Sequence, residues 1–457
     1  MENFASELST GVLDEFRDDF YNNERNVQAQ NVCVRSDPLE SCLSRKVLEH
    51  TNHIFQHKVA EIKPMTNQKS SGRCWLFAAL NVIRIPFAKH HNIEEFEFSQ
   101  SYLFFWDKIE RSNYFLNNIV KTAQRGDKVE DRLLGFLLND PIPDGGQWDM
   151  IVNLINRYGV VPKSSFPETW TTESTTRMNS LLSSKLREFA KELRTMIATI
   201  NGLSNETIQK KIAEQMNVIF RIVGICLGIP SRKFIWEYYD KSKVYHSVGP
   251  VSGLEFYTKY VKPYYNFDDK VCLVTDPRRT NPFGHVYEVE FLGNVVGGRR
   301  TLYNNQQAEL LLNVTGESIK AGEAVWFGCE VSKRSATKYG IHDISSVDLQ
   351  AFFGTDIQMG LAKEDRLIYG DSAMTHAMVF TGVSYNSEGK VEKLRVENSW
   401  GEDRGDKGYH VLTAYWFKEF GFEVVVDKKF VPAEVMAVFQ QEPVLLPAWD
   451  PMGCLAY

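Results

Sequence analysis

The stretch NQKSSGRCWLFAAL, from Asn67 to Leu80, raises the question on which the fold depends. One cysteine, Cys74, stands between turn-forming residues and an apolar run. Free cysteine is among the most buried residue types, so a place at the start of a core helix is the simplest interpretation. The alternative is a nucleophile at a helix N-terminus, where the helix dipole favours a thiolate. The rest of the chain must decide between them.

Composition indicates a globular protein with more than one structural unit. The 457 residues include 24% charged and 43% hydrophobic residues, and the formal net charge is −6. These values exclude extensive disorder, and the acidic balance argues against a dedicated nucleic-acid-binding protein. No uncharged apolar run reaches the ~18 residues that a transmembrane helix needs, so we expect no membrane partner.

The cysteines and the N-terminal segment indicate a reducing compartment. Seven cysteines are spread thinly along the chain, and none forms a CxxC pair. This pattern predicts neither a disulfide framework nor a zinc site, so we expect no metal and no cofactor. The acidic N-terminal segment lacks an apolar core followed by a cleavage site, so we expect no signal peptide and predict a cytoplasmic protein.

Helical patterns fill the first half of the chain. Ser99 is expected to cap one of these helices at its N-terminus, and Gly159 is expected to end another. A strand-rich half follows from Val271 onward. A helical half followed by a strand-rich half predicts an α+β protein with two catalytic subdomains and a cleft between them. Helical spacing is found in residues 4–21, 74–91, 98–111, 148–158 and 173–227; the strand-like runs are KVCLV, HVYEVEF, EAVWFGCEV, HAMVFTGVSY, KLRVENSW, YHVLTAYWF and FEVVVD.

A cysteine nucleophile needs a base, a group that orients this base, and donors for an oxyanion. His376 opens a predicted strand, although a structural histidine would give the same pattern. Asn398 lies 22 residues further on (398 − 376 = 22), a spacing that allows an antiparallel return. Its side-chain oxygen could accept from the imidazole, and Trp400 could shield that bond or belong to the core. Gln68 could donate its side-chain amide to an oxyanion, beside the backbone N–H of Cys74.

Together these residues resemble the motifs of the papain-like cysteine peptidases. Two departures are informative. Ser71 stands where secreted members usually have a cysteine, which fits a reducing compartment. The 302 residues between Cys74 and His376 (376 − 74 = 302) exceed the ~130–150 of papain, so large insertions are expected. The elements that occur in the family's order are Gln68, Cys74-Trp75, His376-Ala377 and Asn398-Ser399-Trp400-Gly401.

The resemblance implies a role for each of these residues. Cys74 would be the nucleophile, His376 its base and acid, and Asn398 the residue that orients the imidazole. Gln68 would supply an oxyanion donor. The residues expected to line the substrate cleft are Gly145, Gly146 and Trp400.

Longer stretches are similar to the bleomycin hydrolase branch of this family, over most of residues 50–457. The resemblance implies a cytosolic aminopeptidase that acts on peptides or small amides with a free N-terminus and assembles as a homohexamer. It also implies that the enzyme's own C-terminal arm sets its specificity. Tyr457 would be removed by self-processing, and Ala456 would carry the carboxylate that meets the substrate's α-amino group. The stretches are EEFEFSQSYLFFWDK, DGGQWDM, LYNNQ, EAVWFGC, RVENSWGED and LPAWDPMG.

The predicted chain has five parts. They are an N-terminal arm (1–60), a helical papain-like subdomain with the nucleophile (61–170), a mainly helical insertion (171–265), a β-rich subdomain with His376 and Asn398 (266–440), and a C-terminal arm (441–457).

Two other functions stay open at this point. A transglutaminase-like acyltransferase also uses cysteine and histidine, but usually with an aspartate as the third residue, so Asn398 argues against it. An oligomeric scaffold that binds nucleic acid is the non-enzymatic alternative, and the acidic net charge leaves nucleic acid a secondary partner at most. Arg73 has no assigned role, because substrate contact and simple surface charge are equally open.

Overall fold

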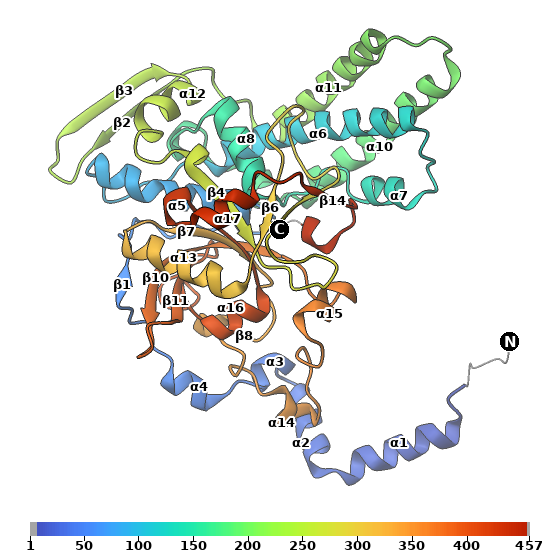
Figure 1. Ribbon diagram of the computed structural model, residues 1–457, viewed down its shortest axis with the longest axis vertical. Helices are drawn as coiled ribbons and strands as arrows, with labels where there is room; N and C mark the ends of the chain where they lie inside the picture. The colour runs from blue at the N-terminus through green and yellow to red at the C-terminus, as the bar shows by residue number, and fades with distance from the viewer. Residues whose placement is uncertain (1–6, 455–457) are drawn as a thin grey trace.

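The computed structural model describes residues 7–454, and most of its helices precede its strands along the chain (Figure 1). No helix in this range is both long and apolar enough to cross a membrane. The helices are α1 (Thr10–Asn22), α2 (Glu24–Cys33), α3 (Pro38–Ser41), α4 (Arg45–His50), α5 (Cys74–His90), α6 (Gln100–Arg125), α7 (Arg132–Asn139), α8 (Trp148–Tyr158), α9 (Trp170–Glu173), α10 (Thr176–Thr199), α11 (Asn205–Leu227), α12 (Gly253–Phe256), α13 (Ala308–Lys320), α14 (Leu349–Phe353), α15 (Lys363–Ile368), α16 (Ala414–Phe420) and α17 (Ala433–Val438).

One large mixed sheet carries the second half of the molecule. Its strand order is β14-β5-β6-β4-β13-β7-β10-β11-β12-β9-β8, with β1 paired to β10, and β2 and β3 form a separate hairpin. The strands are β1 (His57–Lys58), β2 (Phe234–Tyr239), β3 (Tyr245–Val251), β4 (Lys270–Val274), β5 (His285–Val289), β6 (Tyr303–Asn305), β7 (Val325–Cys329), β8 (Ser335–Ala336), β9 (Ile341–His342), β10 (His376–Tyr385), β11 (Val391–Glu397), β12 (Tyr409–Thr413), β13 (Gly421–Asp427) and β14 (Val444–Leu446).

The pairing of the central strand β10 brings the polar residues His376 and Asn398 together. This strand lies antiparallel between β7 and β11, with His376 opposite Cys329 and Val379 opposite Glu397. This register returns the end of β11, and Asn398 just after it, to the start of β10. The strand is buried along nearly its whole length, so the register is fixed by packing on both faces.

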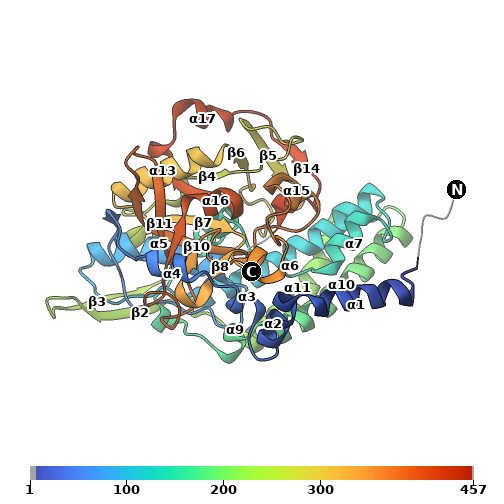
Figure 2. The same cartoon turned by 90° about the horizontal axis from the view of Figure 1, so that it is seen from below.

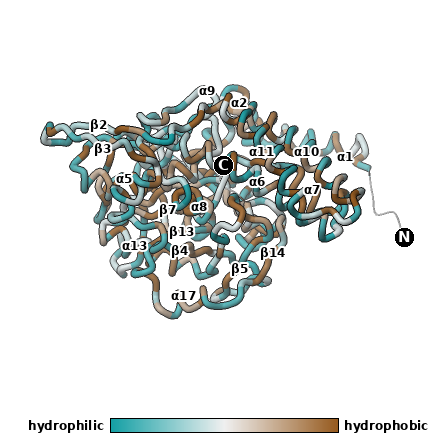
Figure 3. Tube along the Cα trace, turned by 90° about the horizontal axis from the view of Figure 1, so that it is seen from above, coloured by the Kyte–Doolittle hydropathy of each residue, from teal (hydrophilic) through white to brown (hydrophobic). Residues whose placement is uncertain are grey.

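Helix α5 packs against this sheet and forms the other half of the core. Fourteen of its residues are buried, and the indole of Trp326 on β7 donates to the backbone oxygen of Trp75 at 3.2 Å. Figure 2 shows α5 beside β7 and β10, whereas α6, α10 and α11 extend to the other side of the molecule. In Figure 3, hydrophobic residues recur along the central strands and the buried helices.

The predicted helices at 98–111 and 148–158 are confirmed, with the N-cap at Ser99 and the end at Gly159, but the first helix continues past its predicted end. The hydroxyl of Ser99 accepts from the backbone N–H of Tyr102 at 3.1 Å, and α6 continues to Arg125. Gly159 ends α8 with φ +72°, and a Cβ there would lie 2.0 Å from the backbone oxygen of Gly253. Glycine is therefore required both by conformation and by space.

One expectation needs correction. The run YHVLTAYWF is a strand only over β12, because the hydroxyl of Thr413 accepts from the backbone N–H of Trp416 at 3.3 Å and so starts α16. The insertion at 171–265 contains α10 and α11, which pack on α6, but it also contains the β2–β3 hairpin. The hairpin is difficult to predict from the sequence, because its exposed aromatic residues do not alternate regularly with polar ones.

Candidate active site

The nucleophile candidate Cys74 is the first residue of α5, at the end of a tightly held loop. In this loop the hydroxyl of Ser71 donates to the backbone oxygen of Gln68 at 2.6 Å, and the backbone N–H of Gly72 donates to Asp144 at 3.2 Å. Cys74 is 0% exposed, and the backbone N–H of Ala377 donates to its sulfur. The helix N-terminus is thereby fixed against the start of β10.

His376 and Asn398 form the second half of the site. Imidazole Nε2 lies 2.9 Å from Oδ1 of Asn398, and both residues are buried. Because an amide oxygen only accepts, Nε2 carries the proton of the neutral ring and Nδ1 is left as the basic nitrogen. The centroid of the Trp400 ring lies 4.8 Å from that of the imidazole.

Burial favours the neutral forms of both Cys74 and His376. It raises the pKa of the Cys74 thiol to about 12, although the backbone amides of Ala377, Trp75 and Cys74 itself act in the opposite direction. Burial also lowers the pKa of His376 to about 4, against the hydrogen bond to Asn398, which raises it. The expected preference for a thiolate at the helix N-terminus is therefore outweighed by desolvation.

The side-chain amide of Gln68, the predicted oxyanion donor, is held from two sides. Its Oε1 accepts from the hydroxyl of Ser399 at 2.7 Å, and its Nε2 donates to the backbone oxygen of Ser71 at 2.6 Å. One N–H of the amide is left for a ligand. Ser399 orients the amide, a role that sequence reasoning missed although this serine adjoins Asn398.

A buried ion pair joins the two halves of the site. Nη2 of Arg84 on α5 lies 2.6 Å from Oε1 of Glu397, and both side chains are almost fully buried. Glu397 ends β11 and directly precedes Asn398. The pair therefore ties the strand that presents Asn398 to the helix that presents Cys74. Sequence reasoning missed it, because the two residues are 313 positions apart and only the folded chain brings them together.

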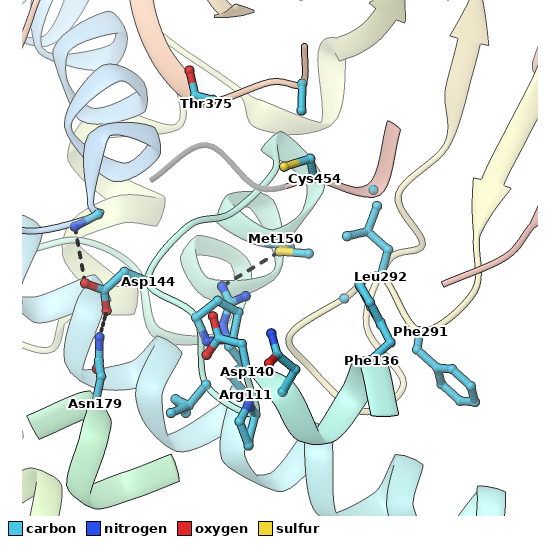
Figure 4. A pocket seen from close by; sticks show the side chains of 18 of the residues that line it. Arg111, Phe136, Asp140, Asp144, Met150, Asn179, Phe291, Leu292, Thr375 and Cys454 are labelled. Carbon is cyan, nitrogen blue, oxygen red and sulfur yellow. Dashed lines mark hydrogen bonds between the residues drawn. The ribbon is translucent and has the colours of Figure 1, made fainter. Parts of the chain in front are cut away.

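Asp144 is a second buried group that sequence reasoning missed. Its carboxylate accepts from Thr175 at 2.5 Å and Asn179 at 2.6 Å, and it lies 2.7 Å from the ammonium of Lys108. Burial alone would raise the pKa of Asp144, but Lys108 and these hydrogen bonds lower it to about 2. Figure 4 shows Asp144 between Asn179 and a backbone nitrogen of the loop that leads to Cys74. An ionised Asp144 thus supports the loop before the nucleophile.

Arg73 is neither a substrate contact nor a surface charge. Its side chain is buried, its Nη1 lies 2.9 Å from Glu168, and its guanidinium stacks over the rings of Phe77 and Phe104. Burial lowers the pKa of Arg73, while the carboxylate of Glu168 acts against this shift. Both interpretations offered by the sequence are therefore wrong, and Arg73 holds the start of α5 from inside.

A cavity of about 1070 Å³ opens beside the catalytic groups and extends toward the helical part of the molecule. Gln68, His376 and Trp400 line it. Gly145 and Gly146 are buried, and a Cβ at Gly146 would lie 2.5 Å from the ring of Trp75. Close packing against Trp75 thus explains why position 146 needs a glycine.

The C-terminal arm forms another part of the same wall. The backbone oxygen of Cys454 accepts from Nε2 of Gln147 at 2.8 Å, directly after Gly146. Figure 4 shows Cys454 and Thr375 on one side of the cavity, with Arg111 and Asp140 on the other. Ala456 and Tyr457 lie outside the described residues. The arm residues that line the cavity are Ala448, Trp449, Asp450, Pro451, Gly453 and Cys454.

Comparison with known proteins now joins this geometry to a family. The model of the Peptidase C1-like family matches residues 7–453. The chain belongs to this family. It is 56% identical to the bleomycin hydrolase of Gallus gallus over 431 residues, which are 94% of each chain. It is 38% identical to the aminopeptidase C of Streptococcus thermophilus over 449 residues, which are 98% of this chain and 99% of that one.

A solved structure carries the same arrangement over the whole chain. The crystal structure of PepW from Lactobacillus rhamnosis HN001 matches with a TM-score of 0.93 and 39% identity, and covers 99% of this chain and 100% of that one. The predicted α+β papain-like fold, with its large insertions and C-terminal arm, is confirmed. So is the prediction of a cysteine peptidase of the bleomycin hydrolase type.

Proposed function

We propose that this protein is a cysteine aminopeptidase that hydrolyses the first peptide or amide bond of substrates with a free N-terminus. One observation carries the proposal: arm residues 448–451, 453 and 454 line the same cavity as His376. The arm narrows the cleft beside the catalytic groups, and an extended chain is accommodated only up to the arm. Such a site selects chain ends rather than internal bonds.

The reaction proceeds through a thioester. Nδ1 of His376 takes the proton from Cys74, and the resulting thiolate attacks the substrate carbonyl. The free N–H of Gln68 and the backbone amide at Cys74 donate to the developing oxyanion. The imidazolium then protonates the leaving amine, and the neutral ring activates water for hydrolysis of the thioester. Asn398 keeps Nε2 occupied throughout, so Nδ1 faces the reacting atoms.

The arm's last residues supply the group that recognises the substrate's α-amine. We infer that Tyr457 is removed by the enzyme itself and that the carboxylate of Ala456 pairs with the substrate ammonium. The bond from Gln147 to Cys454, next to Gly146, supports this placement because it holds the arm at the cleft. Charge-assisted pairing of an ammonium with a carboxylate discriminates strongly against blocked N-termini.

The test compares free and N-acetylated aminoacyl substrates of the same side chain. Wild-type protein is expected to hydrolyse only the free amine well, and a variant that lacks residues 455–457 is expected to accept both. Equal hydrolysis of the two substrates by wild-type protein contradicts the proposal. Intact-mass measurement adds the processing step, since Cys74→Ala protein should retain Tyr457 and wild-type protein should lose it.

We also propose a homohexamer in a reducing compartment such as the cytosol. Helix α1 projects from the body (Figure 1) and has no buried residue, and its apolar side chains Leu13 and Phe16 are exposed. A second copy of the chain is the partner that such a face supports. Sedimentation velocity on wild-type protein and on Leu13→Glu/Phe16→Glu protein tests this, since the substitutions should dissociate the assembly. An unchanged sedimentation coefficient contradicts it.

A further inference from the structure

One buried charged cluster holds the C-terminal arm against the body. The carboxylate of Asp450 accepts from Nη1 and Nη2 of Arg278 at 3.1 and 2.8 Å. Nε of the same guanidinium donates to Oδ1 of Asp276 at 3.0 Å, and Nη2 donates to Oδ2 at 2.8 Å. All three side chains are buried. One arginine therefore joins a carboxylate of the arm to a carboxylate of the body.

The cluster is rigid on the body side. Oδ1 of Asp276 accepts from the backbone N–H of Arg278 at 3.1 Å, and Oδ2 accepts from Asn281 at 2.7 Å. Burial disfavours the charge of Arg278, but hydrogen bonds to both carboxylates raise its pKa, so the cation is retained. A guanidinium presents its donors in a fixed planar fork, so a paired carboxylate has one geometry rather than a range of them.

From Asp450 the arm has little freedom on its way to the cavity. The carboxylate of Asp450 also accepts from the backbone N–H of Met452 at 2.9 Å, which starts the tight turn Pro451–Gly453. Directly after this turn, Cys454 accepts from Gln147. The earlier contacts of the arm are the short strand β14 and the stacking of Arg132 over Trp449, and both lie before Asp450. Asp450 is thus the last charged attachment within the described part of the arm.

We propose that Arg278 is a positioning residue for substrate specificity, because its pairing with Asp450 sets how far the arm extends into the cleft. The inference rests on the proposed role of the arm. A slip by one residue moves an extended chain by ~3.3 Å. Displacements of ~1 Å already cost rate in a site where reacting groups must be held. Arg278 thereby determines where the arm meets the substrate's α-amine, although Arg278 itself does not touch the reacting atoms.

Arg278→Gln is the primary test, with Arg279→Gln as the matched control. Arg279 is the next residue along the chain, and its side chain is 92% exposed. The Arg279→Gln variant therefore reports the effect of losing an arginine alone. For Arg278→Gln, KM for a free-amine substrate is expected to rise roughly tenfold, which is the loss of one moderate interaction. The rate on the N-acetylated substrate should be unchanged or higher. A purely structural role would instead lower activity on both substrates in parallel.

Asp450→Asn makes the result independent of folding. It keeps the size of the side chain and removes only its charge, and it should shift the ratio of free-amine to N-acetylated hydrolysis in the same direction. A wild-type ratio in folded Arg278→Gln or Asp450→Asn protein overturns the inference. Protein that lacks residues 455–457 separates the two proposals. If the truncation leaves the ratio of free-amine to N-acetylated hydrolysis unchanged, the proposed role of the arm is wrong. If the truncation lowers this ratio and the point variants do not, only the proposed role of Arg278 is wrong.

Discussion

The catalytic groups and the C-terminal arm are two neighbouring regions that are held in different ways. Cys74 opens a buried helix, His376 opens a strand of the central sheet and Asn398 directly follows another, and a buried ion pair joins these elements. The arm is held by a three-residue strand, one stacked arginine and the pair Arg278–Asp450. Under the proposed function, the comparison teaches that the chemistry would be built into the core, whereas selection of the substrate would rest on a segment that can change without altering the core.

The largest expected effect lies in the core region and concerns the nucleophile. Cys74→Ala should reduce turnover by roughly 10⁵–10⁶-fold, because removal of a nucleophile disables the whole catalytic unit. Its circular dichroism and assembly should match wild type, since alanine fits the buried position. The measurement is aminopeptidase activity of purified protein. Substantial retained activity would place the chemistry elsewhere in the molecule.

The second prediction compares the ion pairs of the two regions. Arg84→Met leaves Glu397 buried without its cation and should lower the free energy of unfolding by about 3–5 kcal/mol. Arg278→Gln should change specificity with a smaller loss of stability, because its arm can detach. The exposed pair of Arg45 and Glu49 supplies the control, and Arg45→Met should cost less than about 1 kcal/mol. Denaturant unfolding measures all three. An equal loss for Arg84→Met and Arg45→Met would break the comparison.

The third prediction separates oxyanion binding from substrate selection. Gln68→Ala should lower kcat by about 10²–10³-fold, as loss of one oxyanion donor does elsewhere. KM and the preference for a free amine should stay near the wild-type values, because the arm is untouched. Ser399→Ala should give a smaller loss of kcat, since Gln68 is still present but less well oriented. A change confined to KM would argue against the oxyanion role.

The smallest effect is a pH dependence of stability that comes from the buried thiol. The pKa of Cys74 is raised to about 12, so the buried thiol contributes its full share to the stability of the folded state at neutral pH. This contribution is lost as pH rises above 9, the ordinary pKa of a cysteine thiol. His376 acts in the other direction. Its pKa is lowered to about 4, so its contribution is lost as pH falls below 6.5.

Thermal unfolding between pH 7 and pH 10 tests the thiol's share. Cys74→Ala should lose less stability than wild type over this range, and Cys33→Ala, at a partly exposed thiol, should follow wild type. Parallel curves for wild type and Cys74→Ala would mean that the thiol ionises without cost and that the site is open to water.

Local signals placed the candidate residues on their helix and strands, whereas their proposed roles came from the family resemblance. An apolar run after turn-forming residues starts α5 at Cys74, and the strand patterns around His376 and Asn398 bring these residues together. Arg84–Glu397 could not be predicted, because its partners are 313 residues apart and only the folded sheet makes them neighbours. The interpretation of Arg73 failed for the same reason, since a lone charge in a sequence does not reveal the carboxylate and the rings that bury it. Aromatic residues suit both helices and strands, so the start of α16 depended on the capping hydroxyl of Thr413.

Trapping of the acyl-enzyme tests the central claim most directly. Protein is mixed with a slowly hydrolysed ester of a free amino acid, quenched in acid and analysed by intact and peptide mass spectrometry. We predict one acyl group per chain, attached to the peptide that contains Cys74 and absent from Cys74→Ala protein. An adduct on another residue, or turnover without any adduct on Cys74, would contradict the account.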